Sequence, residues 1–134
     1  MKKWRLAMVL LSMGGLLALG AAGCGGISEA NVSGTVLMDG KPLKEGDIVF
    51  EEVDKSKTPA GGKIVDGQYT LQVQPGSKVV RITASRPTKK PDPVMGAAAR
   101  ESMIAKEFNE NTTLKAAVQP GENEGVNFEV KSIR

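Results

Sequence analysis

The sequence predicts an all-β fold, a seven-stranded antiparallel β-sandwich that follows an N-terminal export signal. Three observations predict it. Apolar and polar residues alternate in short runs from residue 31 onward, which is the side-chain period of a strand with one buried face. Asp-Gly and Pro-Gly pairs separate these runs, and such pairs favour turns. A hydrophobic stretch ahead of the single cysteine has the organisation of a signal peptide.

The N-terminal residues predict a lipoprotein signal. Three cations among the first five residues precede an apolar run from Leu6 to Ala22, and Gly23-Cys24 follows. We expect residues 1–23 to be a signal peptide that is cut between Gly23 and Cys24, and the cysteine to be acylated, for example by palmitate. Residues 24–30 would then tether a domain spanning residues 31–134 to a cell membrane or outer membrane, on the exported side. Six extended tether residues reach roughly 20 Å.

Two other interpretations of this segment remain open. A transmembrane helix needs about 20 apolar residues, whereas the run from Leu6 to Ala22 has 17 and contains Ser12 and several glycines. An uncleaved membrane anchor is therefore the second interpretation. A lone cysteine is often a small buried hydrophobe, but Cys24 lies among glycines that offer nothing to bury it. The lipid anchor on Cys24 is the favoured prediction.

Composition excludes several classes of function. The formal charge of +3 comes from the three leader cations, and without them Lys and Arg equal Asp and Glu in number. A neutral domain has no long-range field to attract polyanions, so we expect no nucleic-acid binding. The absence of histidine excludes Ser-His-Asp and Cys-His catalysis and imidazole zinc sites. No phosphate-binding glycine loop occurs. We expect no cofactor and no metal.

The first three strands are expected in the N-terminal half of the domain. Residues 31–38 alternate, with Val32 and Val36 on one face, and Asp39-Gly40 ends the run because this pair readily adopts positive φ. Residues 47–52 form the second strand, with Ile48 and Phe50 on one face. Residues 54–62 are expected as a polar loop, and residues 63–65 as a short third strand.

Four further strands are expected. Asp66-Gly67 leads into residues 68–74, and alternation around an Asp-Gly pair indicates a hairpin. Pro75-Gly76 ends that strand and residues 77–85 form the next. Residues 113–119 and 126–131 are the last two strands, joined by a loop that starts with Pro120-Gly121. Seven short strands at this spacing predict an antiparallel sandwich.

The segment from 86 to 111 is expected to be a long loop, and connections of this length are either functional or disordered. Its first part, to Pro93, is rich in proline and should be extended. Residues 96–108 contain helix-forming residues and are expected to form one or two helical turns. A solvated loop and the covering of one sandwich edge are the structural alternatives to an interaction role. The candidate interaction residues are Arg86, Lys89, Lys90, Met95, Met103 and Phe108.

Acidic residues offer two weaker candidates. Glu51, Glu52 and Asp54 carry oxygen ligands suited to calcium, but they alternate across a strand end without a calcium-loop motif, so a solvated hairpin is favoured. A carboxylate pair for glycoside hydrolysis stays open on spacing alone. The mature chain has few aromatic residues for a sugar site.

The ordered motifs resemble one family. They are Val32-Ser33-Gly34-Thr35-Val36, Asp39-Gly40-Lys41-Pro42-Leu43, Asp66-Gly67-Gln68-Tyr69-Thr70-Leu71, Pro75-Gly76, the strand from Val79 to Ser85, Phe108-Asn109, Thr113-Leu114 and Pro120-Gly121-Glu122-Asn123. Together with Cys24 they resemble small lipoproteins of planctomycete-type bacteria that carry a carboxypeptidase regulatory-like domain. The resemblance implies a prealbumin-like, transthyretin-like sandwich and export. It implies little about function, because the domain accompanies a catalytic unit in carboxypeptidases and the sequence shows none.

The expected function is therefore that of a lipid-anchored, non-enzymatic lipoprotein of the cell envelope with a structural or interaction role. Its expected partners are the membrane, through Cys24, and an envelope polymer or protein. One alternative is a module that binds an envelope polymer or a small ligand through residues 86–111. A small carboxylate-dependent hydrolase is the third hypothesis.

Overall fold

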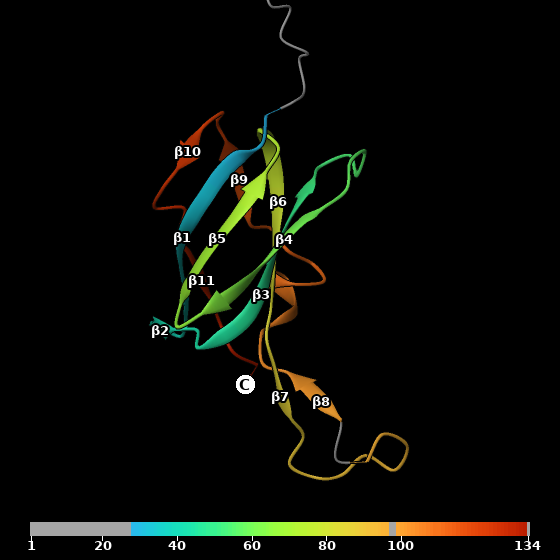
Figure 1. Ribbon diagram of the computed structural model, residues 1–134. Coiled ribbons are helices and arrows are strands. Elements are labelled where there is room, and N and C mark those ends of the chain that lie inside the picture. Colours follow the sequence, from blue (N-terminus) through green and yellow to red (C-terminus); the bar gives the residue numbers. More distant parts are fainter. Residues whose placement is uncertain (1–27, 97–98, 134) are drawn as a thin grey trace, which may run out of the picture.

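The computed structural model describes residues 28–96 and 99–133. The predicted signal peptide, Gly23 and Cys24 lie outside the described residues. Within them the chain is an all-β fold in which a curled, largely antiparallel sheet encloses the core, and a two-stranded hairpin extends from one end (Figure 1). No helix in these two ranges is long and apolar enough to cross a membrane.

The elements follow one another along the chain, with the longest connection between β7 and β8. They are β1 (Ala30–Met38), β2 (Lys41–Pro42), β3 (Glu45–Glu52), β4 (Ala60–Val65), β5 (Gln68–Val73), β6 (Gly76–Thr83), β7 (Ser85–Pro87), β8 (Arg100–Ser102), the 3-10 turn η1 (Lys106–Phe108), β9 (Lys115–Val118), β10 (Glu122–Asn123) and β11 (Phe128–Val130).

The main sheet has the strand order β10-β1-β5-β4-β3-β6-β9, and β2 and β11 also pair with β1. Its ladders are antiparallel except along one edge of β1, where β10 and β11 run parallel to it. In the ladder between β4 and β5, the structure pairs Val65 with Gln68 beside the turn, whereas β3 pairs with β4 over six positions. The sheet therefore curls sharply at this hairpin.

The alternating residues form the core inside the curl. Val32, Ile48, Val80 and Ile82 are fully buried, as the sequence pattern predicts. The rings of Phe50, Tyr69 and Phe128, which come from β3, β5 and β11, lie with centroids 6.2 to 6.4 Å apart. Aromatic pairs at this spacing attract one another beyond the area that they bury. This cluster joins strands from opposite parts of the sheet.

The expected strands occur at the expected places, with different bounds. β4 begins at Ala60 rather than at residue 63, because Ala60, Gly61 and Gly62 pair with Phe50, Val49 and Ile48. The expected loop is therefore shorter than residues 54–62. Both Asp-Gly turns are confirmed, since Asp39, Gly40, Asp66 and Gly67 all have positive φ.

Of the one or two helical turns expected over residues 96–108, the described residues show a single 3-10 turn. Within this segment β8 pairs with β7, and the 3-10 turn η1 spans only residues 106–108. Helix propensity is a weak preference that packing overrides: Ala99 and Ile104 are buried at 5% and 1% exposure. The expected long loop from 86 to 111 is thus a hairpin followed by a segment that closes one edge of the core.

The C-terminal segment follows β1 along its length. Asn31 and Val32 pair with Glu122 and Asn123, and farther along Val36 pairs with Phe128. One additional residue therefore stands on the C-terminal side between these pairs, which is the arrangement of a bulge.

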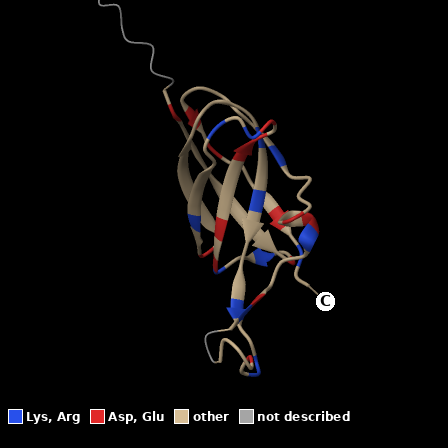
Figure 2. Ribbon diagram, turned by 90° about the vertical axis from the view of Figure 1, so that its right-hand side faces the viewer, with Lys and Arg blue, Asp and Glu red and all other residues tan. Residues whose placement is uncertain are grey.

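The two ends of the sheet differ. β1 starts at Ala30 at one end, and the β7–β8 hairpin projects from the other end in both views (Figures 1 and 2). Nine residues of β1 at about 3.3 Å each span roughly 30 Å. Charges of both signs are interspersed over the body (Figure 2).

Candidate functional site

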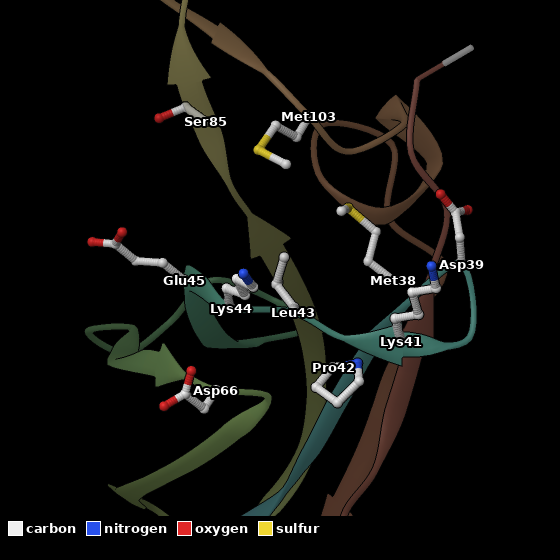
Figure 3. A pocket seen from close by; sticks show the side chains of 10 residues that line it. All are labelled: Met38, Asp39, Lys41, Pro42, Leu43, Lys44, Glu45, Asp66, Ser85 and Met103. Carbon is white, nitrogen blue, oxygen red and sulfur yellow. The ribbon is translucent and has the colours of Figure 1, made fainter.

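A cavity of about 940 Å³ lies at the hairpin end of the sheet, between the end of β1, the start of β3 and the root of β7. Figure 3 shows its lining side chains. We call it the methionine groove. It is lined by Met38, Asp39, Lys41, Pro42, Leu43, Lys44, Glu45, Asp66, Ser85 and Met103.

The two Asp-Gly turns position the floor of the groove. The turn at Asp39 sends the chain back along β1, where the N–H of Leu43 donates to Val36 (3.0 Å). The N–H of Gly67 donates to the Leu43 carbonyl (2.7 Å), so the second turn is bonded to the segment that follows the first. Gly67 has φ +76°, and a Cβ there would lie 2.7 Å from Pro42 Cβ. Glycine at this position therefore permits the turns to interlock.

Met38 and Met103 direct their side chains into the groove from two sides (Figure 3). Met38 ends β1, and Met103 is fixed by its N–H bond to Ala84 (2.9 Å) and by its carbonyl, which accepts from Ile133 (3.0 Å). Both are partly buried and pack against the core. Thioether side chains are flexible and polarisable, so they adapt to apolar surfaces of different shape.

A second hollow of about 590 Å³ continues the groove toward the C-terminus. It shares Met38, Asp39 and Met103 with the groove and adds Arg86 and Ile133, whose side chain is exposed. Asp39 accepts from the N–H and hydroxyl of Ser132 (3.2 and 2.5 Å), which holds the C-terminal segment beside it. The two hollows form one concave surface around the methionines.

Charged residues of both signs line the groove, two lysines and three acidic residues. Lys41 and Lys44 are exposed beside Glu45 and Asp66. In Figure 3 the carboxylates of Glu45 and Asp66 lie to one side, away from the two thioethers. The surface is thus an apolar concavity with a mixed polar rim, an arrangement suited to binding a partner with both apolar and polar groups.

Hydrogen bonds and an ion pair between β7 and β8 hold the hairpin that lies beside the groove. Arg86 Nε lies 2.6 Å from Glu101 Oε1, and Arg100 donates to the hydroxyl and carbonyl of Ser85 (2.9 and 2.8 Å). At its tip, N–H groups of Met95 and Val94 donate to Asp92 (2.9 and 2.7 Å) and hold the pKa of that carboxyl below its ordinary value.

The six candidate interaction residues lie in three different places in the structure. Arg86 and Met103 lie at the groove and its extension. Lys89, Lys90 and Met95 are exposed on the hairpin loop, with Met95 63% exposed. Phe108 is half-buried against the core. They do not form one patch.

The acidic residues considered for calcium are held by other groups. Glu51 pairs with Arg81 (3.2 Å) and Glu52 with Lys78 (2.5 Å), and Asp54 accepts from the N–H of Ser56 (3.0 Å). Across residues 28–96 and 99–133, no three side chains of the His, Cys, Asp and Glu types come together as a metal site would require.

Sequence reasoning missed residues 41–45 and Asp66 as parts of a site. The signal was present in the two Asp-Gly pairs, but their spacing along the chain does not show that the turns meet. No protein-family model matches the chain, and no curated protein is detectably similar to it in sequence.

Proposed function

We propose that this chain is a lipid-anchored, non-enzymatic module of the cell envelope that binds an envelope protein or polymer through the methionine groove. The observation that carries the proposal is the convergence of two interlocked turns, two methionines and the hairpin root on one concave surface. Such apolar concavities with a few polar groups are the usual form of binding sites.

The direction of β1 supports an orientation for this module. A tether upstream of Ala30 joins the sheet at the end opposite the groove (Figure 1). With a short tether, the groove and the cations of the hairpin would face away from the anchoring membrane, about 30 Å from the start of β1. The partner is then a component that lies off the bilayer, rather than the lipid surface.

We also propose that the curled sheet is a two-layer sandwich of the prealbumin type, as in carboxypeptidase regulatory-like domains. The narrow junction between β4 and β5 supports two layers. The contacts of Phe50 with Tyr69 and Phe128 support packing of one layer on the other.

Metabolic labelling with an alkyne fatty acid tests the anchor. The wild-type chain is expected to take up label, and Cys24→Ser is expected to take up none. Equal labelling of both, or none in either, contradicts the lipid anchor. A screen on glycan and ester panels tests the non-enzymatic role, because turnover that Glu45→Gln or Asp66→Asn removes would establish the hydrolase alternative.

Photo-crosslinking in cells tests the groove. p-Benzoylphenylalanine in place of Lys44, at the rim, is expected to give a discrete adduct, and the same residue in place of Lys115, on β9 outside the groove, is expected to give none. Met103→Glu should abolish the adduct because it puts a charge on the apolar wall. Met95→Glu, the matched control on the exposed loop, should not. An adduct that forms in equal amount with and without Met103→Glu contradicts the proposal.

Binding through the hairpin loop is the second candidate, and its support is the ordered root of that hairpin. The N–H of Thr88 donates to Ala99 (3.1 Å), so residues 89–98 can be replaced by Asn-Gly while the strands stay paired. If this variant loses the adduct and the Met103→Glu variant keeps it, binding is assigned to the loop rather than to the groove.

A further inference from the structure

A second, polar cavity of about 760 Å³ lies at the opposite end of the sheet from the methionine groove. It is bordered by the connection between β3 and β4, the end of β5 and the start of β6, and Glu29 just before β1 also lines it. Lys78, Gln74 and Thr58 line this cavity, with Phe50 among the apolar residues behind them. We call it the proximal cavity, since it lies beside the start of β1.

Lys78 brings a buried positive charge to the proximal cavity. Its residue exposure is 4%, the lowest of any charged residue in the part of the chain that the structure describes. Its ammonium group can donate three hydrogen bonds. Among the described residues its acceptor is Glu52 Oε1 at 2.5 Å, and the same oxygen lies 3.5 Å from Lys57. The Lys78 ammonium group therefore has N–H donors without an acceptor among those residues, in a buried position, where an unmet donor costs free energy.

Gln74 brings an unmet acceptor to the same cavity. Its Oε1 atom is buried, and no donor in the described residues reaches it. Gln74 and Lys78 stand on either side of the Pro75-Gly76 turn that joins β5 to β6. A residue with a surplus donor and a residue with an unsatisfied acceptor thus line one cavity. A hydroxyl group suits both needs, since it donates one hydrogen bond and accepts others.

The charges around the proximal cavity favour an uncharged ligand. The charged side chains that line it, within the described ranges, are Glu29, Glu52, Lys57 and Lys78, two of each sign. Ser56, Thr58 and Thr70 add further polar residues to its lining. We propose that the proximal cavity binds a small uncharged polyhydroxyl molecule of the sugar or polyol class, held through Lys78 and Gln74. This site is separate from the groove of the proposed function.

NMR titration of the ¹⁵N-labelled full chain, in a polyoxyethylene detergent that carries no sugar, tests the proposal. The probes are methyl β-glucoside, N-acetylglucosamine and glycerol, with acetate and methylammonium as charged comparisons. At least one uncharged probe is expected to shift the amide signals of the non-proline residues in 56–61 and 70–78 to saturation and to leave those in 38–45 unchanged. Gln74→Leu is expected to weaken this binding at least tenfold.

The matched control is Gln68→Leu, the same substitution at the exposed first position of β5, which should bind like the wild type. Thr58→Val is a second cavity variant and should also weaken binding, because it removes a lining hydroxyl. The absence of saturable shifts with every uncharged probe, or equal affinity in Gln74→Leu, overturns the proposal and leaves ordered water as the occupant. Tighter binding of either charged probe overturns the assignment to an uncharged ligand.

Discussion

The hydroxyl of Tyr69 donates a 2.6 Å hydrogen bond to the carbonyl oxygen of Val126, across 57 positions of sequence. Tyr69 faces Gly34 in the pairing of β5 with β1. A Cβ on Gly34 would lie 2.0 Å from the same Val126 oxygen. Because Gly34 has no side chain, the C-terminal segment can approach the edge of β1. Tyr69 then donates a hydrogen bond to the Val126 carbonyl, which lies closest to Gly34.

Tyr69→Phe is expected to lower the free energy of unfolding by about 1 to 2 kcal/mol, because it leaves the Val126 carbonyl without its donor while the ring contacts remain. Chemical denaturation of the full chain measures the change. Thr70→Val, on the exposed face of the same strand, is the control and should change stability by less than about 0.5 kcal/mol. Equal effects of the two substitutions would show that the bond contributes nothing.

Alkaline pH should destabilise the fold through Tyr69. Burial raises the pKa of Tyr69 above its ordinary value of 10.0, so above pH 10 the unfolded chain loses a proton that the folded chain keeps. Stability then falls by about 1.4 kcal/mol per pH unit. Tyr69 is the single tyrosine, and its phenolate absorbance reports the titration directly. Tyr69→Phe should remove this part of the pH dependence, and an unchanged alkaline slope in that variant would refute the assignment.

Gly34→Ala is expected to cost more than about 3 kcal/mol or to displace the C-terminal segment, because backbone atoms of Val126 occupy the space that the Cβ needs. Gly61→Ala on β4 is the matched control, since its Cβ would have its nearest neighbours at 3.8 Å. The free energy of unfolding of both variants tests the contrast. A Gly34→Ala protein as stable as Gly61→Ala would contradict the close approach.

The two turn glycines should differ in cost. Gly40 and Gly67 both have positive φ, so alanine at either position costs roughly 1 to 2 kcal/mol of strain. Only at Gly67 does the added Cβ also meet Pro42, at 2.7 Å, whereas Gly40 has no neighbour within 4 Å. We expect Gly67→Ala to be the more destabilising in thermal unfolding and to shift the NMR signals of residues 41–45 in the groove. Equal melting temperatures would argue against the interlocked turns.

Acid should weaken the pair of Glu52 and Lys78. The hydrogen bond from Lys78 lowers the pKa of Glu52 from 4.5, with Lys57 adding to the effect. The stability that ionised Glu52 gives is therefore present above about pH 4.5 and is lost as pH falls through its pKa in the folded state. Glu52→Gln should be less stable than the wild type at pH 7 and lose less stability on acidification.

Asp47→Asn is the control for that experiment. Its partner Lys63 lies 2.5 Å away, but their side chains are 48% and 77% exposed, against 17% and 4% for Glu52 and Lys78. Exposed ion pairs contribute little to stability, so Asp47→Asn should be nearly neutral at pH 7. Denaturation curves of both variants at pH 7 and pH 3 make the comparison, and identical curves would show that burial of Lys78 has no consequence.

Local patterns predicted much of the fold. Alternation over residues 68–74 predicted β5 and the buried face that carries Tyr69 and Leu71, because a strand exposes and buries successive residues in turn. The same alternation in β6 places Lys78 on the buried face with Val80 and Ile82. The face of the strand on which Lys78 lies follows from the sequence pattern, whereas its partner Glu52 does not. One or two helical turns were predicted over residues 96–108 from helix propensity, but tertiary packing, which buries Ile104, leaves one 3-10 turn there.

The sequence by itself determined where seven of the strands and both Asp-Gly turns occur and which side chains of those strands face inward, since these depend on neighbours along the chain. Only the tertiary structure decided that Val126 reaches Gly34, that the turn at Asp66 bonds to Leu43, and that Lys78 pairs with Glu52. Backbone hydrogen bonds pair strands whatever their residue types, so alternation does not encode which strands become neighbours. Both candidate sites form where segments distant in the sequence meet, so sequence patterns alone did not predict either site.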